Sequence, residues 1–208
     1  MNSSKVFSQF ARYIALATAI GVCSLAMTPA AMAEEKIGAK VGKPLQAAQE
    51  LAQKKDLNGA LEKVKEAEAV SSKTPFEQFK IDQFKVFIQL QRADYSAAGK
   101  AMEATVAAGY LSAEDVTKTY KSLAQIAYQV KDYNKVIEYG KKYTQNAPGD
   151  LELQLLVIQA QYLLKDFKST ASGLRSVVAS ADKSGKEVKE DWLQLLMSAE
   201  FEQQNPTG

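Results

Sequence analysis

The side chains that most often carry out catalysis are nearly missing from this 208-residue chain. It contains no histidine, and Cys23 is its single cysteine. The commonest general base, thiol nucleophile and zinc ligands are therefore scarce. Serine–lysine neighbours occur at Lys121-Ser122 and Lys168-Ser169, but adjacent residues on a helix point apart and cannot form a catalytic dyad. The composition predicts a protein that is not an enzyme and that binds no metal or cofactor.

Two further patterns have structural explanations. The sequence SGKE at 184–187 is similar to the end of a phosphate-binding loop, but Ser180 stands where that loop has its first glycine and Glu187 replaces its serine or threonine. We expect a turn between helices there. Acidic pairs occur in predicted first turns of helices, where the helix dipole favours negative charge. These pairs are Glu114-Asp115 and Glu190-Asp191.

Residues 1–33 have the order of a secretory signal peptide. Lys5 and Arg12 precede an apolar run of 14 residues, Ile14 to Met27, and Ala31-Met32-Ala33 fits a small-x-small cleavage site. We expect export, with the periplasm as the destination and cleavage after Ala33. The apolar run is shorter than the about 20 residues that cross a membrane, so an uncleaved anchor is the weaker alternative.

Lipid attachment at Cys23 is a third alternative, which Val22 disfavours because lipoprotein signals have a small residue directly before the cysteine. Cleavage would remove Lys5 and Arg12, leaving 24 basic and 24 acidic residues and a formal charge of zero. The mature chain would then have no charge excess for nucleic acid or anionic lipid. It would also contain no cysteine, so its stability would not depend on disulfides.

The rest of the chain is predicted to be all-helical, because no stretch alternates with period two. Thr74, Pro75 and Glu77 form a capping box with proline at the first helical position, and Ser112 and Asp115 follow the same logic. We expect a short N-terminal segment over 34–42, a helical repeat domain over 43–204 and a C-terminal end at 205–208. The expected helices are 43–54, 58–70, 75–92, 95–108, 112–130, 133–146, 150–164, 167–182 and 187–203.

Four similar segments recur along this domain, each with aspartate before an apolar or aromatic residue. The aspartates are Asp56, Asp94, Asp132 and Asp166, with spacings of 38, 38 and 34 residues. We expect each to cap a second helix. Leu57, Tyr95, Tyr133 and Phe167 would then fill the corner between paired helices, and Ala60, Ala98, Val136 and Thr170 would lie where helices cross. A period of this length with two helices in each unit predicts an α-solenoid.

The sequence resembles the tetratricopeptide repeat (TPR) family over about residues 44 to 204. The stretch LAQIAYQVKDYNKVIEYGKKYTQNAP at 123–148 fits best, with Leu123, Ala124, Tyr133 and Pro148 in the family's positions. The resemblance implies a superhelix of stacked antiparallel helix pairs, about four and a half repeats long, that binds a peptide or protein in its concave groove. A generic helical bundle with accidental repetition is the alternative.

In the TPR family, the first helix of each unit lines the groove. The resemblance places eleven residues there: Gln49, Gln53, Ile88, Arg92, Lys118, Lys121, Gln125, Tyr128, Gln129, Gln159 and Tyr162. This set is rich in glutamine and lightly basic near the middle. Amides can both donate to and accept from an extended peptide backbone, and tyrosine offers flat contact area with a polar tip.

These observations favour a non-enzymatic scaffold in the bacterial cell envelope that binds a peptide or protein partner. Residues 190–204 suggest an alternative, because Trp192, Leu193, Leu196, Met197 and Phe201 are too many apolar groups for one contact face. Either the chain belongs to a longer array, or a partner covers this helix. In the alternative function, the protein is an accessory subunit of an envelope assembly, such as TonB-type transport or surface-polymer export, docked through its last helix.

Overall fold

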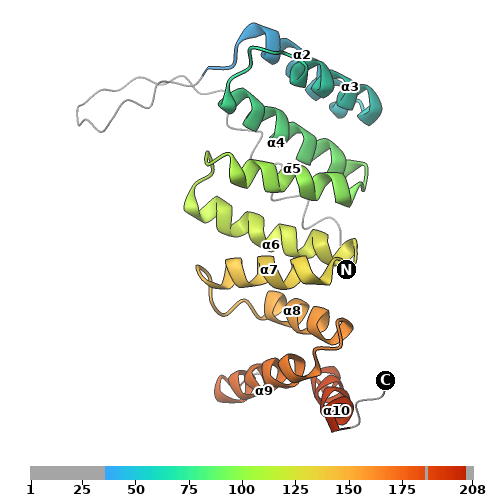
Figure 1. The fold of residues 1–208 in the computed structure, drawn as a ribbon, viewed down its shortest axis with the longest axis vertical. Helices are drawn as coiled ribbons and strands as arrows, with labels where there is room; N and C mark the ends of the chain where they lie inside the picture. Colours follow the sequence, from blue (N-terminus) through green and yellow to red (C-terminus); the bar gives the residue numbers. More distant parts are fainter. Residues whose placement is uncertain (1–35, 186, 205–208) are drawn as a thin grey trace, which may run out of the picture. The chain divides into compact units, whose positions relative to one another are not determined.

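The computed structural model describes residues 36–185 and 187–204, and this part of the chain forms α-helices and no strands (Figure 1). The predicted signal peptide and residues 205–208 lie outside it. The helices are α2 (Ala39–Gln53), α3 (Leu57–Glu68), α4 (Pro75–Gln91), α5 (Tyr95–Ala107), α6 (Ala113–Gln129), α7 (Tyr133–Thr144), α8 (Leu151–Leu163), α9 (Phe167–Lys183) and α10 (Glu190–Gln204). None of these helices combines the length and apolar character needed to cross a membrane.

The chain divides into two compact units, and the first ends at Asp94. In this unit α2 packs along α3, and α4 packs against α3 and also contacts α2. The buried side chains come from all three helices and include Leu45, Val64, Ile81 and Ile88. Each helix therefore buries an apolar side against its neighbours, as a helix must do to be stable in a small domain.

The second unit begins at Tyr95 and contains α5 to α10. Each helix packs against the next one along the chain, and α6 also contacts α8 (Figure 1). One core at its C-terminal end joins Ile158 of α8, Leu174 and Val177 of α9, and Trp192 of α10. Contacts between helices that are near in sequence agree with the predicted α-solenoid of adjacent helix pairs.

The four predicted corners share one backbone conformation. In the third corner, Lys131 has a φ of 61°, in the left-handed region. The amide of Asp132 donates to the carbonyl of Ala127 at 2.9 Å, and that of Lys131 donates to Tyr128 at 3.1 Å. These two bonds define the Schellman C-cap of a helix. The same bonds and a positive φ occur at Lys55, Ala93 and Lys165.

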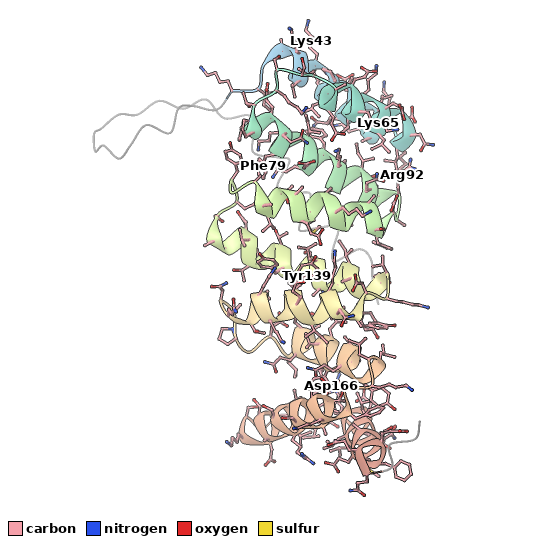
Figure 2. All side chains as sticks on the ribbon, viewed as in Figure 1. Lys43, Lys65, Phe79, Arg92, Tyr139 and Asp166 are labelled. Carbon is pink, nitrogen blue, oxygen red and sulfur yellow. The ribbon has the colours of Figure 1, made fainter. Side chains whose placement is uncertain are left out.

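The residues around these corners take the predicted roles. Asp56, Asp132 and Asp166 each accept a hydrogen bond from the amide three residues later, and Asp166 lies at the start of α9 (Figure 2). Asp94 directly precedes α5. The four residues expected at helix crossings are 0% exposed: Ala60, Ala98, Val136 and Thr170. The periodicity thus predicted both the turn and the tightest packing positions.

The predicted start of the first helix is wrong, since α2 begins at Ala39 and contains Pro44. Proline inside a helix removes a hydrogen bond, but the four additional residues bury Val41 to 1% exposure. The amide of Gly38 donates to Glu77 at 2.8 Å. Glu77 also makes the predicted capping box with Thr74. Hydrogen bonds from the amides of Thr74 and Gly38 lower the pKa of Glu77, so its carboxylate holds the start of α2 against α4.

Candidate partner-binding face

Four predicted site residues form one stripe along α6. Lys118, Lys121, Gln125 and Gln129 follow one another at intervals of three or four residues, which places them on one side of a helix. Lys118 and Gln129 are exposed, and the two residues between them are half-buried. The opposite side of α6 is buried and includes Leu123, which is 2% exposed. This stripe is the most accessible side of α6.

The next first helix, α8, carries an equivalent amide. Gln159 follows Gln125 by 34 residues, and each lies seven residues before the aspartate of its corner. Gln159 is exposed, and α6 and α8 are in contact. We call these five residues, Lys118, Lys121, Gln125, Gln129 and Gln159, the α6–α8 polar face.

An ion-pair cluster joins the two helices at one end of this face. Lys121 Nζ lies 2.7 Å from Asp150 Oδ2 and 3.3 Å from Glu152 Oε2. Asp150 also caps α8 by accepting from the amide of Leu153 at 3.1 Å, and it accepts from the Tyr143 hydroxyl at 3.0 Å. The cluster therefore connects α6, the end of α7 and the start of α8.

The protonation of this cluster follows from its contacts. Burial opposes the charge on Asp150, but hydrogen bonds from Lys121, the Leu153 amide and Tyr143 outweigh it and lower its pKa. Burial likewise opposes the charge on Lys121, but the hydrogen bonds and negative charges of Asp150 and Glu152 raise its pKa. Both groups remain charged at neutral pH, so Lys121 is committed to a structural ion pair.

The face is electrically balanced, and the expectation that it is lightly basic is wrong. Lys118 forms an ion pair with Glu114, one turn earlier on α6, and Lys121 is paired across to α8. The composition suggested a basic centre because the paired carboxylates of Glu114, Asp150 and Glu152 were left out of the set. The uncompensated polar groups that remain are the amides of Gln125, Gln129 and Gln159.

The two predicted site tyrosines pack at corners. The ring of Tyr128 meets that of Tyr133 edge-on, with centroids 5.8 Å apart, and Tyr162 meets Phe167 in the same way at 5.5 Å. The hydroxyl of Tyr162 lies 2.8 Å from Ser198 Oγ of α10. Both side chains are half-buried. Their main contacts are within the fold, and they border the polar face.

The assignments of Ile88 and Arg92 are corrected by the structure. Ile88 is 0% exposed and belongs to the core of the first unit, so its side chain offers no surface to a partner. Counted back from Asp94, the positions equivalent to Gln125 and Gln129 are Phe87 and Gln91, one residue earlier in each case. Arg92 caps the end of α4 and donates to Asn58 (Figure 2).

The remaining predicted site residues, Gln49 and Gln53, lie on α2 in the first unit. They hold the same register as Gln125 and Gln129, seven and three residues before their corner aspartate. Gln53 is exposed and Gln49 is half-buried. The same count identifies a residue that the sequence reasoning missed: Leu163, at the end of α8, is 48% exposed and corresponds to Gln129.

A second polar cluster joins α5 to α7. Glu103 accepts from Lys135 at 2.7 Å and from the buried hydroxyl of Tyr139. Burial and the bond to Glu103 raise the pKa of Tyr139 well above its usual value, so the phenol stays protonated. Lys142 lies 5.3 Å from the centroid of Tyr120. These groups have their partners within the fold, and the cluster fixes α5 against α7.

The geometry therefore gives a polar contact surface on α6 and α8, and no group of metal-ligating side chains is assembled in the described part of the chain. No known protein-family model matches the sequence, and no curated protein is significantly similar to it.

Proposed function

We propose that this protein is an exported, non-enzymatic scaffold of the TPR type, and that its α6–α8 polar face binds a peptide or protein of the cell envelope. The observation that carries the proposal is the recurrence of Gln125 and Gln159 at one position relative to identical corners. In a repeat protein, equivalent positions on successive first helices form a continuous binding surface.

The chemistry of the face indicates an extended peptide as its ligand. An amide side chain can donate and accept at once, which matches the alternating N–H and C=O groups of a peptide backbone. The lysines are neutralised by their own carboxylates, so a strongly acidic ligand gains little here. Binding would therefore depend on shape and hydrogen bonding more than on charge.

The location in the periplasm rests on the sequence of residues 1–33, whose charged, apolar and small-residue order is that of a signal peptide. The absence of an enzymatic role rests on the lack of histidine and on the structural use of the charged clusters. Together these support a protein that holds others and does not convert a substrate.

The test is capture of partners from envelope extract with a Gln125→Ala/Gln159→Ala variant. Each amide lost should remove about 1 kcal/mol of hydrogen bonding, so we expect roughly tenfold or greater weakening for the double variant. A matched control is Asn134→Ala/Lys141→Ala, which changes two exposed residues of α7 and should bind normally. Equal recovery of partners by both variants and the unmodified protein would contradict the proposal. Tyr128 and Tyr162 are unsuitable for this test because their loss would disturb the corners.

The alternative function, an accessory subunit docked in a transport or export assembly, uses α10. It is favoured by Leu193, Met197 and Phe201, which are 41%, 69% and 64% exposed. In that case Phe201→Glu should abolish capture while Gln125→Ala/Gln159→Ala should leave it intact. The two functions therefore predict opposite results for the same pair of variants.

A further inference from the structure

The last helix presents an apolar stripe to solvent. Leu193, Met197 and Phe201 follow one another at intervals of four residues, so they lie along one side of α10. The other side is buried: Trp192 is 7% exposed and Ala199 is 0% exposed. We call the three exposed residues the α10 stripe. Large apolar side chains grouped in this way mark a contact surface.

Helix α8 shows what normally covers this side of a first helix. Val157 lies against Gly140 of the preceding helix α7, whereas Ile158 lies against Gly173 of the following helix α9. Tyr162, one turn after Ile158, also contacts α9 through Phe167. The first helix thus has one side for the helix before it and another for the helix after it.

The same division places the α10 stripe on the side for a following helix. Trp192 packs in one core with Leu174 and Val177 of α9, as Val157 packs against α7, and it follows Val157 by 35 residues. Leu193 and Met197 follow Ile158 and Tyr162 by the same 35 residues. The stripe is therefore built to pack against a helix that runs antiparallel to α10.

We propose that this helix is α10 of a second copy of the chain, in a two-fold dimer centred on Met197. The stripe is symmetric about its middle residue, so an antiparallel copy places Leu193 opposite Phe201 of the second copy and Met197 opposite itself. Such a self-complementary patch is what a two-fold interface requires.

The charges of α10 favour this antiparallel arrangement. All charged residues of α10 are acidic: Glu190, Asp191, Glu200 and Glu202. In the proposed register, Glu190 lies opposite Gln204 of the second copy and Glu200 lies opposite Gln194. Each carboxylate at the rim thus meets an amide that can donate to it. A parallel pair would place every carboxylate opposite its own copy, which is unfavourable.

The dimer should be reversible. Three partly exposed side chains from each copy bury much less than the about 800 Å² per partner of a stable interface. We therefore expect association that depends on protein concentration in the micromolar to millimolar range. Self-association would also occupy the surface on which the alternative function depends, while leaving the α6–α8 polar face unchanged.

Disulfide trapping tests the register. In a Cys23→Ser background, which contains no other cysteine, Met197→Cys should form a covalent dimer on mild oxidation because the two sulfurs face each other. Leu193→Cys and Phe201→Cys should each remain monomeric alone and should link when mixed. Val130→Cys is the control, since Val130 is 43% exposed and lies outside α10.

Sedimentation of the purified chain gives an independent readout. The average mass of the unmodified protein should rise with concentration, and Phe201→Glu should keep it monomeric with an unchanged helical circular dichroism spectrum. Three results would overturn the proposal: a monomer at all concentrations, linking of Met197→Cys no greater than that of Val130→Cys, or self-linking of Leu193→Cys. None of these results depends on partner capture, so this inference and the scaffold function can fail separately.

Discussion

Replacing Lys131 by glycine should stabilise the protein. Lys131 has a φ of 61° at the third corner, and a left-handed conformation costs a residue with a Cβ about 1–2 kcal/mol. Glycine avoids this cost but loses about 0.4–1 kcal/mol more conformational entropy on folding. The difference is a net gain of about 0.5–1 kcal/mol in the free energy of unfolding. Both Schellman hydrogen bonds are retained, because they involve only the backbone.

Lys100→Gly is the matched control. Lys100 is exposed in the middle of α5, where the same chemical change should cost about 0.5–1 kcal/mol because glycine is a poor helix former. Urea denaturation followed by circular dichroism should therefore shift the midpoint upward for Lys131→Gly and downward for Lys100→Gly. A downward shift for both variants would refute the left-handed corner, and with it the shared turn on which the repeat is based.

Two other predictions concern packing and charge. Ala98→Leu should destabilise the protein by roughly 1–3 kcal/mol because Ala98 is 0% exposed, whereas Gln125→Ala should change stability by less than about 0.5 kcal/mol; equal shifts in melting temperature would mean that the register is wrong. Asp150→Asn should cost about 1 kcal/mol at pH 7, because asparagine keeps the cap but loses the ion pair with Lys121. Since the pKa of Asp150 is lowered in the folded state, its stabilisation is present above the unfolded pKa and is lost as pH falls through the folded pKa. The cost measured by urea denaturation should therefore shrink toward zero in acid, and a cost that does not change with pH would contradict this account.

The corners could be predicted from sequence because their chemistry is local. An aspartate that caps the next helix bonds to an amide only three residues away, as Asp132 does with Lys135 at 3.2 Å. The crossing position four residues after it is equally local, and Val136 is fully buried as expected. Repetition then strengthened each signal, since the same pattern occurs four times.

The errors involve contacts between residues far apart in the chain. The start of α2 depends on a bond between Gly38 and Glu77, which a helix-stop signal such as Pro44 does not reveal. The neutral charge of the polar face depends on a pair between Lys121 and Asp150, separated by 29 residues. Periodicity places a residue on a face, but it does not say which charge comes to lie beside it.

The misplaced site residue Ile88 shows why the corner determines the binding surface. A helix turns by about 100° for each residue, so a shift of one position moves a side chain from the accessible side into the core. Gln125 and Gln159 keep the same distance from their aspartates, and both reach the surface. Ile88 lies one residue nearer to Asp94 than this distance, and it is fully buried. The turn therefore fixes more than the end of a helix: it sets the rotation of each first helix, and so decides which side chains a partner can contact.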